Sequence, residues 1–215
     1  LRCLYVQEDV AGTVTEMLFG AMEDLALGDP WQLATDIGPV IDAEAQTGIR
    51  DYIAAARGEG RVMKELTAPQ GGTFIAPTVL RVGGISDMPR EIFGPVLHVA
   101  TFRASEIDAV IDAINATGYG LTFGLHSRID DRVQRIMERL RVGNAYVNRN
   151  QIGAVVGSQP FGGEGLSGTG PKAGGPDYLH RFTRQAAPEA AGDAPASDEA
   201  AVAKALAAPM AVPAP

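Results

Sequence analysis

Residues 96–148 read VLHVATFRASEIDAVIDAINATGYGLTFGLHSRIDDRVQRIMERLRVGNAYVN, and their apolar residues follow two alternating periods. Short apolar runs typical of strands occupy three places, at residues 96–102, 121–127 and 144–148. Between these runs, apolar residues recur as on one face of a helix, with Ser105 and Asp130 as the expected helix starts. Strands that alternate with helices at this spacing pair in parallel through right-handed crossovers. The stretch therefore predicts an α/β fold with a parallel sheet.

The part of the chain before residue 91 shows the same two periods less regularly. Residues 1–7 (LRCLYVQ) are expected to form a strand buried on both faces, because apolar residues fill most of its positions. Asp42 is the expected N-cap of a helix that Gly58 ends, and the predicted buried face of this helix carries Ile49, Ile53 and Ala56.

Composition excludes several classes of protein. The chain has 215 residues, of which 46% are hydrophobic and 20% are charged, so it can bury a core. Its formal net charge of −8 argues against a nucleic-acid or anionic-membrane surface. A single cysteine excludes a disulfide framework and suits a reducing compartment. No apolar run approaches the length of a membrane helix and no secretory signal is visible, so we expect a cytoplasmic protein.

Three regions are expected along the chain. Residues 1–178 form the main domain. Residues 179–185 alternate well enough for a strand, and its late position makes it an edge strand that can join a partner subunit. Residues 186–215 are rich in Ala and Pro and contain no aromatic residue, so they are predicted to be a mostly disordered tail.

A glycine-rich segment, QIGAVVGSQPFGGEGLSGTGPKAGGP at residues 151–176, directly follows the strand predicted at residues 144–148. Its glycines allow backbone N–H groups to point into a cavity. It is either a long surface loop or a binding loop, and its place beyond the carboxyl end of a strand favours the second interpretation. Gly163, Gly165 and Gly168 spell GxGxxG, but the residues that follow cannot start a helix, so a Rossmann fingerprint is not expected.

Other candidate residues carry less specific signals. Cys3 lies within a predicted strand, which favours a small buried cysteine over a nucleophile. The three histidines lie at no metal-ligand spacing, so no metal site is expected. In Glu91-Ile92-Phe93-Gly94-Pro95, a carboxylate and an aromatic ring precede a buried strand. They are equally well explained as a ribose contact with a ring beneath the cofactor, and as an exposed Glu beside a packed Phe.

Three motifs together resemble the aldehyde dehydrogenase superfamily. They are EIFGPV at residues 91–96, QPFGG at residues 159–163 and LSG at residues 166–168. Within that superfamily, residues 150–182 closely resemble the L-glutamate γ-semialdehyde (1-pyrroline-5-carboxylate) dehydrogenase module of the proline utilization A family. Members of that family are bifunctional bacterial enzymes in which a proline dehydrogenase module precedes this one. The resemblance implies the aldehyde dehydrogenase fold, in part.

The resemblance also implies roles for five residues. Glu91 would accept hydrogen bonds from the nicotinamide ribose of NAD, and Phe93 would pack near the nicotinamide. The backbone N–H groups of Gly153 and Ala154 would hold the α-carboxylate of L-glutamate γ-semialdehyde in an anchor loop. Phe161 would pack on the aliphatic part of this substrate.

The resemblance further implies that the nucleophilic cysteine and the general-base glutamate lie upstream of Leu1. This chain would then contain no catalytic residue and be inactive alone, as part of a larger NAD-dependent enzyme that oxidises the semialdehyde to L-glutamate. FAD would belong only to a preceding proline dehydrogenase module. Expected partners are the upstream half of the same polypeptide and further copies in a homo-oligomer, and the intact enzyme is compatible with a peripheral place at the inner membrane. Two alternatives remain, an inactive oligomerisation or scaffold module and a dehydrogenase for another semialdehyde.

Overall fold

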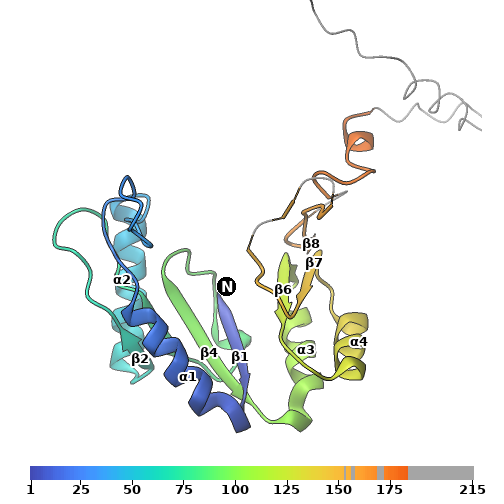
Figure 1. Cartoon of the computed structure of the whole chain (residues 1–215), viewed down its shortest axis with the longest axis horizontal. Helices are drawn as coiled ribbons and strands as arrows, with labels where there is room; N and C mark the ends of the chain where they lie inside the picture. Colours follow the sequence, from blue (N-terminus) through green and yellow to red (C-terminus); the bar gives the residue numbers. More distant parts are fainter. Residues whose placement is uncertain (153, 156–157, 169–171, 184–215) are drawn as a thin grey trace, which may run out of the picture. The chain divides into compact units, whose positions relative to one another are not determined.

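The computed structural model describes residues 1–152, 154–155, 158–168 and 172–183 of the chain (Figure 1). It contains two compact units, of which the first is Leu1–Tyr178 and the second begins at Leu179. Among the described residues, no helix is both long enough and apolar enough to cross a bilayer.

A four-stranded sheet organises the N-terminal half of the first unit. Its strands lie in the order β1-β4-β3-β2. The central strand β4 (Val96–Phe102) pairs in parallel with β1 (Cys3–Gln7) on one side and with β3 (Thr78–Arg81) on the other. The short strand β2 (Val62–Glu65) pairs with β3 in the antiparallel direction. The predicted α/β fold with a parallel sheet is therefore confirmed.

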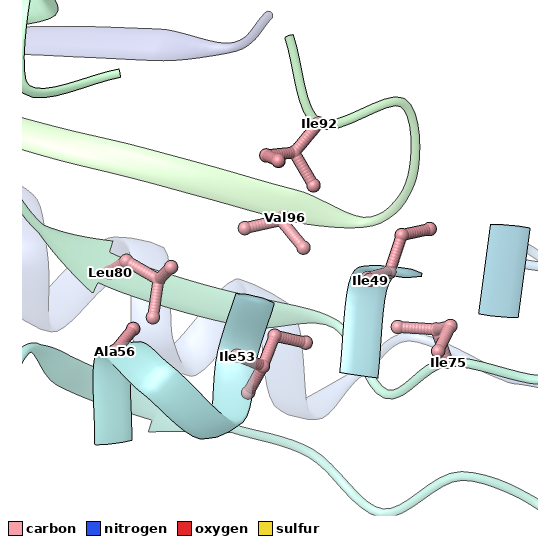
Figure 2. Packing of buried hydrophobic residues seen from close by; sticks show 7 residues of the cluster. All are labelled: Ile49, Ile53, Ala56, Ile75, Leu80, Ile92 and Val96. Carbon is pink, nitrogen blue, oxygen red and sulfur yellow. The ribbon is translucent and has the colours of Figure 1, made fainter. Parts of the chain in front are cut away.

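Two helices cover the two faces of this sheet. On one face, the helix α2 (Ala43–Gly58) packs Ile49, Ile53 and Ala56 against residues of β3 and β4, as predicted. Figure 2 shows this cluster, which is completed by Ile75, Leu80, Ile92 and Val96. On the other face, α1 (Glu8–Glu23) contributes Met22 to a cluster with Val6, Val79 and Val99. Each large aliphatic side chain buried in this way contributes roughly 1.5–3 kcal/mol to folding.

The start of α2 follows the sequence prediction closely. The Asp42 side chain accepts a hydrogen bond from the backbone N–H of Ala45 at 2.7 Å, so it satisfies one of the free donors at the helix N-terminus. The prediction for residues 1–7 was only partly right. β1 forms there, but only Val6 in it is buried, because β1 lies at the edge of the sheet.

A second parallel pair follows in the C-terminal half. It joins β6 (Thr122–Leu125) to β7 (Asn144–Val147). In the chain, the helix α3 (Ile107–Ala116) lies between β4 and β6, and the helix α4 (Asp130–Arg139) lies between β6 and β7. The two helices are linked by ion pairs from Arg139 to Asp108 and Asp112. The alternation predicted from residues 96–148 is thus present, but β4 and β6 belong to different sheets.

Two local features depart from the predicted pattern. Ser105 does not cap α3, because it lies inside a 3₁₀ turn (Ala104–Glu106) in which the Glu106 carboxylate accepts from the backbone N–H of Arg103 at 2.9 Å. Part of the GxGxxG stretch forms the strand β8 (Glu164–Gly165), which pairs with β5 (Tyr119–Gly120) in the antiparallel direction. The residues after this stretch, 169–171, on which the rejection of a Rossmann fingerprint rested, lie outside the described residues.

The strand predicted at residues 179–185 is wrong for the residues that the structure describes. Leu179–Phe182 is a 3₁₀ helix, and the backbone N–H and hydroxyl of Thr183 both donate to the carbonyl of His180, at 3.3 and 2.8 Å. A strand needs a neighbouring edge to satisfy its backbone groups, and local turn bonds satisfy them here instead. The tail predicted at residues 186–215 lies outside the described residues.

Candidate functional site: the turn before β4 and the glycine-rich loop

A tight turn before β4 presents Glu91 and Phe93 to solvent. The backbone N–H of Gly94 donates to the carbonyl of Ile92 at 3.0 Å, and that of Val96 donates to the carbonyl of Gly94 at 2.8 Å. Ile92, which lies between Glu91 and Phe93, is 1% exposed and packs into the cluster of buried residues around α2. Because Ile92 fastens the turn to the core, its neighbours point outward, and Phe93 is 77% exposed.

Glu91 and Phe93 are brought together by one cation. The Arg2 guanidinium pairs with the Glu91 carboxylate at 2.8 Å and lies 4.6 Å from the centre of the Phe93 ring. Glu91 is therefore an exposed carboxylate beside an exposed aromatic ring, and the alternative in which Phe93 is packed into the protein is wrong. A carboxylate accepts hydrogen bonds from a pair of neighbouring hydroxyls, and an aromatic face stacks on a planar ring. The residues present thus fit the ribose and nicotinamide of NAD.

The second part of the site is the segment after β7, which Asn144 holds in place. The Asn144 side chain, 8% exposed as a residue, donates from Nδ2 to the carbonyl of Pro160 at 2.9 Å and accepts at Oδ1 from the N–H of Gly162 at 3.0 Å. One carboxamide thereby clamps the backbone on both sides of Phe161. Sequence reasoning missed Asn144, although a polar residue at the start of a predicted buried strand was a signal that could have found it.

Phe161 is further fixed by a backbone bridge. Its N–H donates to the carbonyl of Ala173 at 2.9 Å, and the N–H of Ala173 donates back at 2.8 Å. Phe161 is 41% exposed, so its backbone is held by hydrogen bonds while the residue remains available for contact. The backbone next to Phe161 also packs closely against the residue that precedes β7, because a Cβ built on Gly143 would lie 1.7 Å from the carbonyl oxygen of Gly162. Only glycine fits at Gly143.

The loop that was expected to anchor the substrate is described in part. Ala154 is half-buried, and Gly153 lies outside the described residues. Near this loop, three buried side-chain atoms have no hydrogen-bond partner among the described residues: Tyr146 OH, Gln151 Oε1 and Gln159 Oε1. Gln151 Oε1 lies 2.9 Å from where a Gly124 Cβ would be, and Gly124 pairs with Tyr146 across β6 and β7. Unpaired buried groups of this kind are sites where a bound water or ligand completes the hydrogen bonding.

Cys3 does not have the properties of a nucleophile. It is half-buried in β1, and burial raises the pKa of its thiol to about 11. A nucleophilic cysteine needs the opposite shift, because the thiolate is the reactive form. The sequence favoured a small buried cysteine, and the structure shows Cys3 half-buried rather than buried.

The structure thus brings Glu91 and Phe93 together and fixes Phe161 separately. Among the described residues, no hydrogen bond or ion pair joins Glu91 or Phe93 to Ala154 or Phe161. The described residues also contain no group of three or more His, Cys, Asp or Glu side chains that could hold a metal ion.

Fold and site together define a class of protein. A parallel α/β sheet, an EIFGPV turn that presents a carboxylate and a ring, and a glycine-rich loop are the features of an aldehyde dehydrogenase. The aldehyde dehydrogenase family matches the chain over residues 1–187, and the chain belongs to this family.

Three similar proteins indicate which branch of the family this chain resembles. The "Bifunctional protein PutA" of Klebsiella aerogenes is 48% identical over 200 residues, which cover 89% of this chain and 15% of that protein. A crystal structure of a Bradyrhizobium japonicum proline utilization A (PutA) mutant is 53% identical, with a TM-score of 0.82 over 85% of this chain and 19% of that one. A 1-pyrroline-5-carboxylate dehydrogenase from Thermus with bound NAD is 37% identical, with a TM-score of 0.75, and covers 84% of this chain and 35% of that one.

These matches confirm the resemblance to the proline utilization A family. The chain spans about 15% of the length of the PutA relative from Klebsiella aerogenes.

Proposed function

We propose that this chain supplies the nicotinamide-ribose contact and the substrate anchor of an NAD-dependent dehydrogenase. The enzyme would oxidise L-glutamate γ-semialdehyde to L-glutamate, the second step of proline catabolism. The observation that carries the proposal is the exposed pair Glu91 and Phe93, which a buried Ile92 fastens to the core. The similarity to PutA proteins and to a 1-pyrroline-5-carboxylate dehydrogenase with bound NAD supports the choice of substrate and cofactor.

Glu91 and Phe93 would hold the reactive end of the cofactor. The Glu91 carboxylate accepts hydrogen bonds from the two ribose hydroxyls, and the Phe93 ring lies against the nicotinamide. When bound, NAD supplies a hydride acceptor. The contribution of this chain is orientation. When the nicotinamide ring is held in a fixed position, less entropy is lost on reaching the transition state.

Gly153, Ala154 and Phe161 would hold the substrate. The backbone N–H groups of Gly153 and Ala154 donate to its α-carboxylate, as in other backbone nests that bind anions. Phe161 covers its aliphatic carbons. The clamp by Asn144 keeps Phe161 in place without adding a charge that would repel the carboxylate.

The nucleophile would come from elsewhere in the enzyme. Cys3 is the one cysteine of this chain, and its raised pKa leaves it as a thiol at neutral pH. We therefore propose that the activity belongs to a polypeptide that joins this chain to a catalytic cysteine and a general-base glutamate. FAD would serve only a proline dehydrogenase module of that polypeptide. We also propose that the enzyme is a cytoplasmic homo-oligomer.

Steady-state kinetics of the intact protein test the proposal. Gly153→Val should raise KM for the semialdehyde more than KM for NAD, because a side chain in the anchor loop obstructs the α-carboxylate. Gly12→Val in α1 is the matched control, since nothing lies within 4 Å of a Cβ at Gly12. Equal effects of the two substitutions would refute the anchor role.

The same assay separates the alternatives. If kcat/KM is higher for another acid semialdehyde than for L-glutamate γ-semialdehyde, that compound is the substrate, and the protein is still part of an aldehyde dehydrogenase. A protein that binds no NAD and instead co-purifies with a full-length dehydrogenase would be a scaffold module, and the proposal would be wrong.

A further inference from the structure

Arg2 contacts three residues of the turn before β4, namely Glu91, Phe93 and Gly94. Its Nε donates to Glu91 Oε1 at 2.8 Å, and one terminal nitrogen donates to the carbonyl of Gly94 at 3.2 Å. Its guanidinium carbon lies 4.6 Å from the centre of the Phe93 ring. A planar guanidinium can donate in its plane and stack through its face at the same time, which a lysine ammonium cannot do.

The backbone of Arg2 is held just as firmly by a buried histidine. His98 in β4 is 0% exposed, and its backbone N–H and its Nδ1 both lie near the Arg2 carbonyl, at 3.1 and 3.0 Å. A carbonyl only accepts, so Nδ1 carries the ring proton and Nε2 accepts from the Tyr52 hydroxyl at 2.9 Å. Tyr52 belongs to α2, so Arg2 is anchored through His98 to the core.

The ion pair between Arg2 and Glu91 adds little to folding stability. The Arg2 side chain is 33% exposed and the Glu91 side chain 57% exposed, and exposed pairs of this kind contribute roughly 0–1 kcal/mol. The contacts of Arg2 are better explained by what they orient. Without Arg2, an exposed carboxylate and an exposed ring would each sample several rotamers, and a ligand would have to order both.

We infer that Arg2 is a positioning residue that presets the Glu91 carboxylate and the Phe93 ring for the nicotinamide ribose. The inference rests on the proposed function, because it takes NAD as the ligand of the turn. Arg2 also offsets the charge of Glu91, which would otherwise repel the pyrophosphate of a dinucleotide. Both effects favour cofactor binding and leave the aldehyde anchor unaffected.

The test compares two Arg2 substitutions in the intact protein. Arg2→Met removes the guanidinium and keeps an apolar chain, and Arg2→Lys keeps only the charge. We expect Arg2→Met to raise KM for NAD about tenfold, as for loss of a charge-assisted hydrogen bond, with KM for the semialdehyde changed less than about twofold. Arg2→Lys should be intermediate. Arg57→Met is the matched control, because Arg57 forms an exposed ion pair with Glu65 away from the turn.

Four results decide the outcome. A rise in KM for NAD alone, with an unchanged melting temperature, supports the inference. An unchanged KM for NAD in Arg2→Met, or equal rises for both substrates, would overturn it while wild-type activity upholds the proposed function. If the wild-type protein binds NAD but does not oxidise the semialdehyde, the proposed substrate fails, and the NAD Kd of Arg2→Met from calorimetry judges Arg2. A wild-type protein that binds no NAD would overturn both.

Discussion

Gly94 lies where the turn before β4 meets the core, and Gly94→Ala is expected to destabilise the protein through one neighbour. A Cβ at this position would lie 2.6 Å from Cδ1 of Ile49 in α2, closer than real carbon contacts allow. The next atoms are Cγ1 of Ile49 at 3.6 Å and Cγ1 of Val40 at 3.9 Å, which are ordinary contacts. The φ of Gly94 lies outside the left-handed region, so the backbone itself tolerates alanine.

The magnitude follows from this single clash. Ile49 is 5% exposed and packed within the α2 cluster, so Cδ1 has little room to move. Overpacking of a core by one methyl group costs about 1–3 kcal/mol. Ile49→Val removes the clashing Cδ1 and costs about 0.5–1.5 kcal/mol by itself. The double variant should be nearly as stable as Ile49→Val alone, so the coupling free energy should match the cost of Gly94→Ala, about 1–3 kcal/mol.

Urea unfolding followed by circular dichroism measures the four free energies of this cycle. Gly48→Ala is the control, since Gly48 precedes Ile49 in α2 and has nothing within 4 Å of an added Cβ. It should stabilise the protein by about 0.5–1 kcal/mol, as for glycine replaced within a helix. Additive effects of Gly94→Ala and Ile49→Val, or a Gly94→Ala variant as stable as the wild type, would refute the clash.

Three further predictions concern a buried histidine, the cysteine and the loop clamp. Burial lowers the pKa of His98, so the stability it contributes is present above the unfolded pKa of about 6.5 and is lost as pH falls toward the folded pKa. Urea midpoints between about pH 7.5 and 5.5 should therefore fall for the wild type and change less for His98→Asn; parallel slopes would contradict this. Cys3, with a pKa of about 11, should react with iodoacetamide at pH 8 at least about tenfold more slowly than free cysteine. Mass spectrometry would measure this, and labelling at the free rate would show that Cys3 is not shielded. Asn144→Ala leaves two backbone groups around Phe161 without their side-chain partner, so it should cost about 1–3 kcal/mol and raise KM for the semialdehyde above that for NAD. A protein with unchanged urea midpoint and KM would show that the clamp is dispensable.

The helices and strands could largely be predicted from local sequence patterns. The helix α2 begins at its predicted cap, Asp42, and buries the predicted residues, because capping and a 3.6-residue period act within a few positions. Strand existence was predictable in the same way, but membership of a sheet was not. The pattern in residues 96–148 predicted the parallel pair of β6 and β7, but it could not show that β4 pairs with β1 and β3, since those partners lie outside the stretch.

The candidate site shows the same difference between local motifs, which could be predicted, and contacts between distant segments, which could not. Glu91 and Phe93 could be named from a short motif, and their exposure agrees with it. Arg2 and Asn144 were missed, because each acts on a segment distant in sequence, at the turn before β4 or around Phe161. Only Asn144 carried a signal of its own, as a polar residue at the start of a predicted strand. The strand expected at residues 179–185 failed for a related reason, as alternation alone does not supply a partner strand.

The pairing of β1 with β4 has a consequence for synthesis of the chain. Cys3 pairs with His98, so about 95 residues must follow β1 before its partner exists. At roughly 5–20 residues per second, β1 would wait about 5–20 seconds on the ribosome with an unpaired edge. The helix α1 can form in that time, because its hydrogen bonds are local. Folding of this half is therefore expected to be completed by the emergence of β4, and a chain interrupted before residue 96 would expose β1 to aggregation.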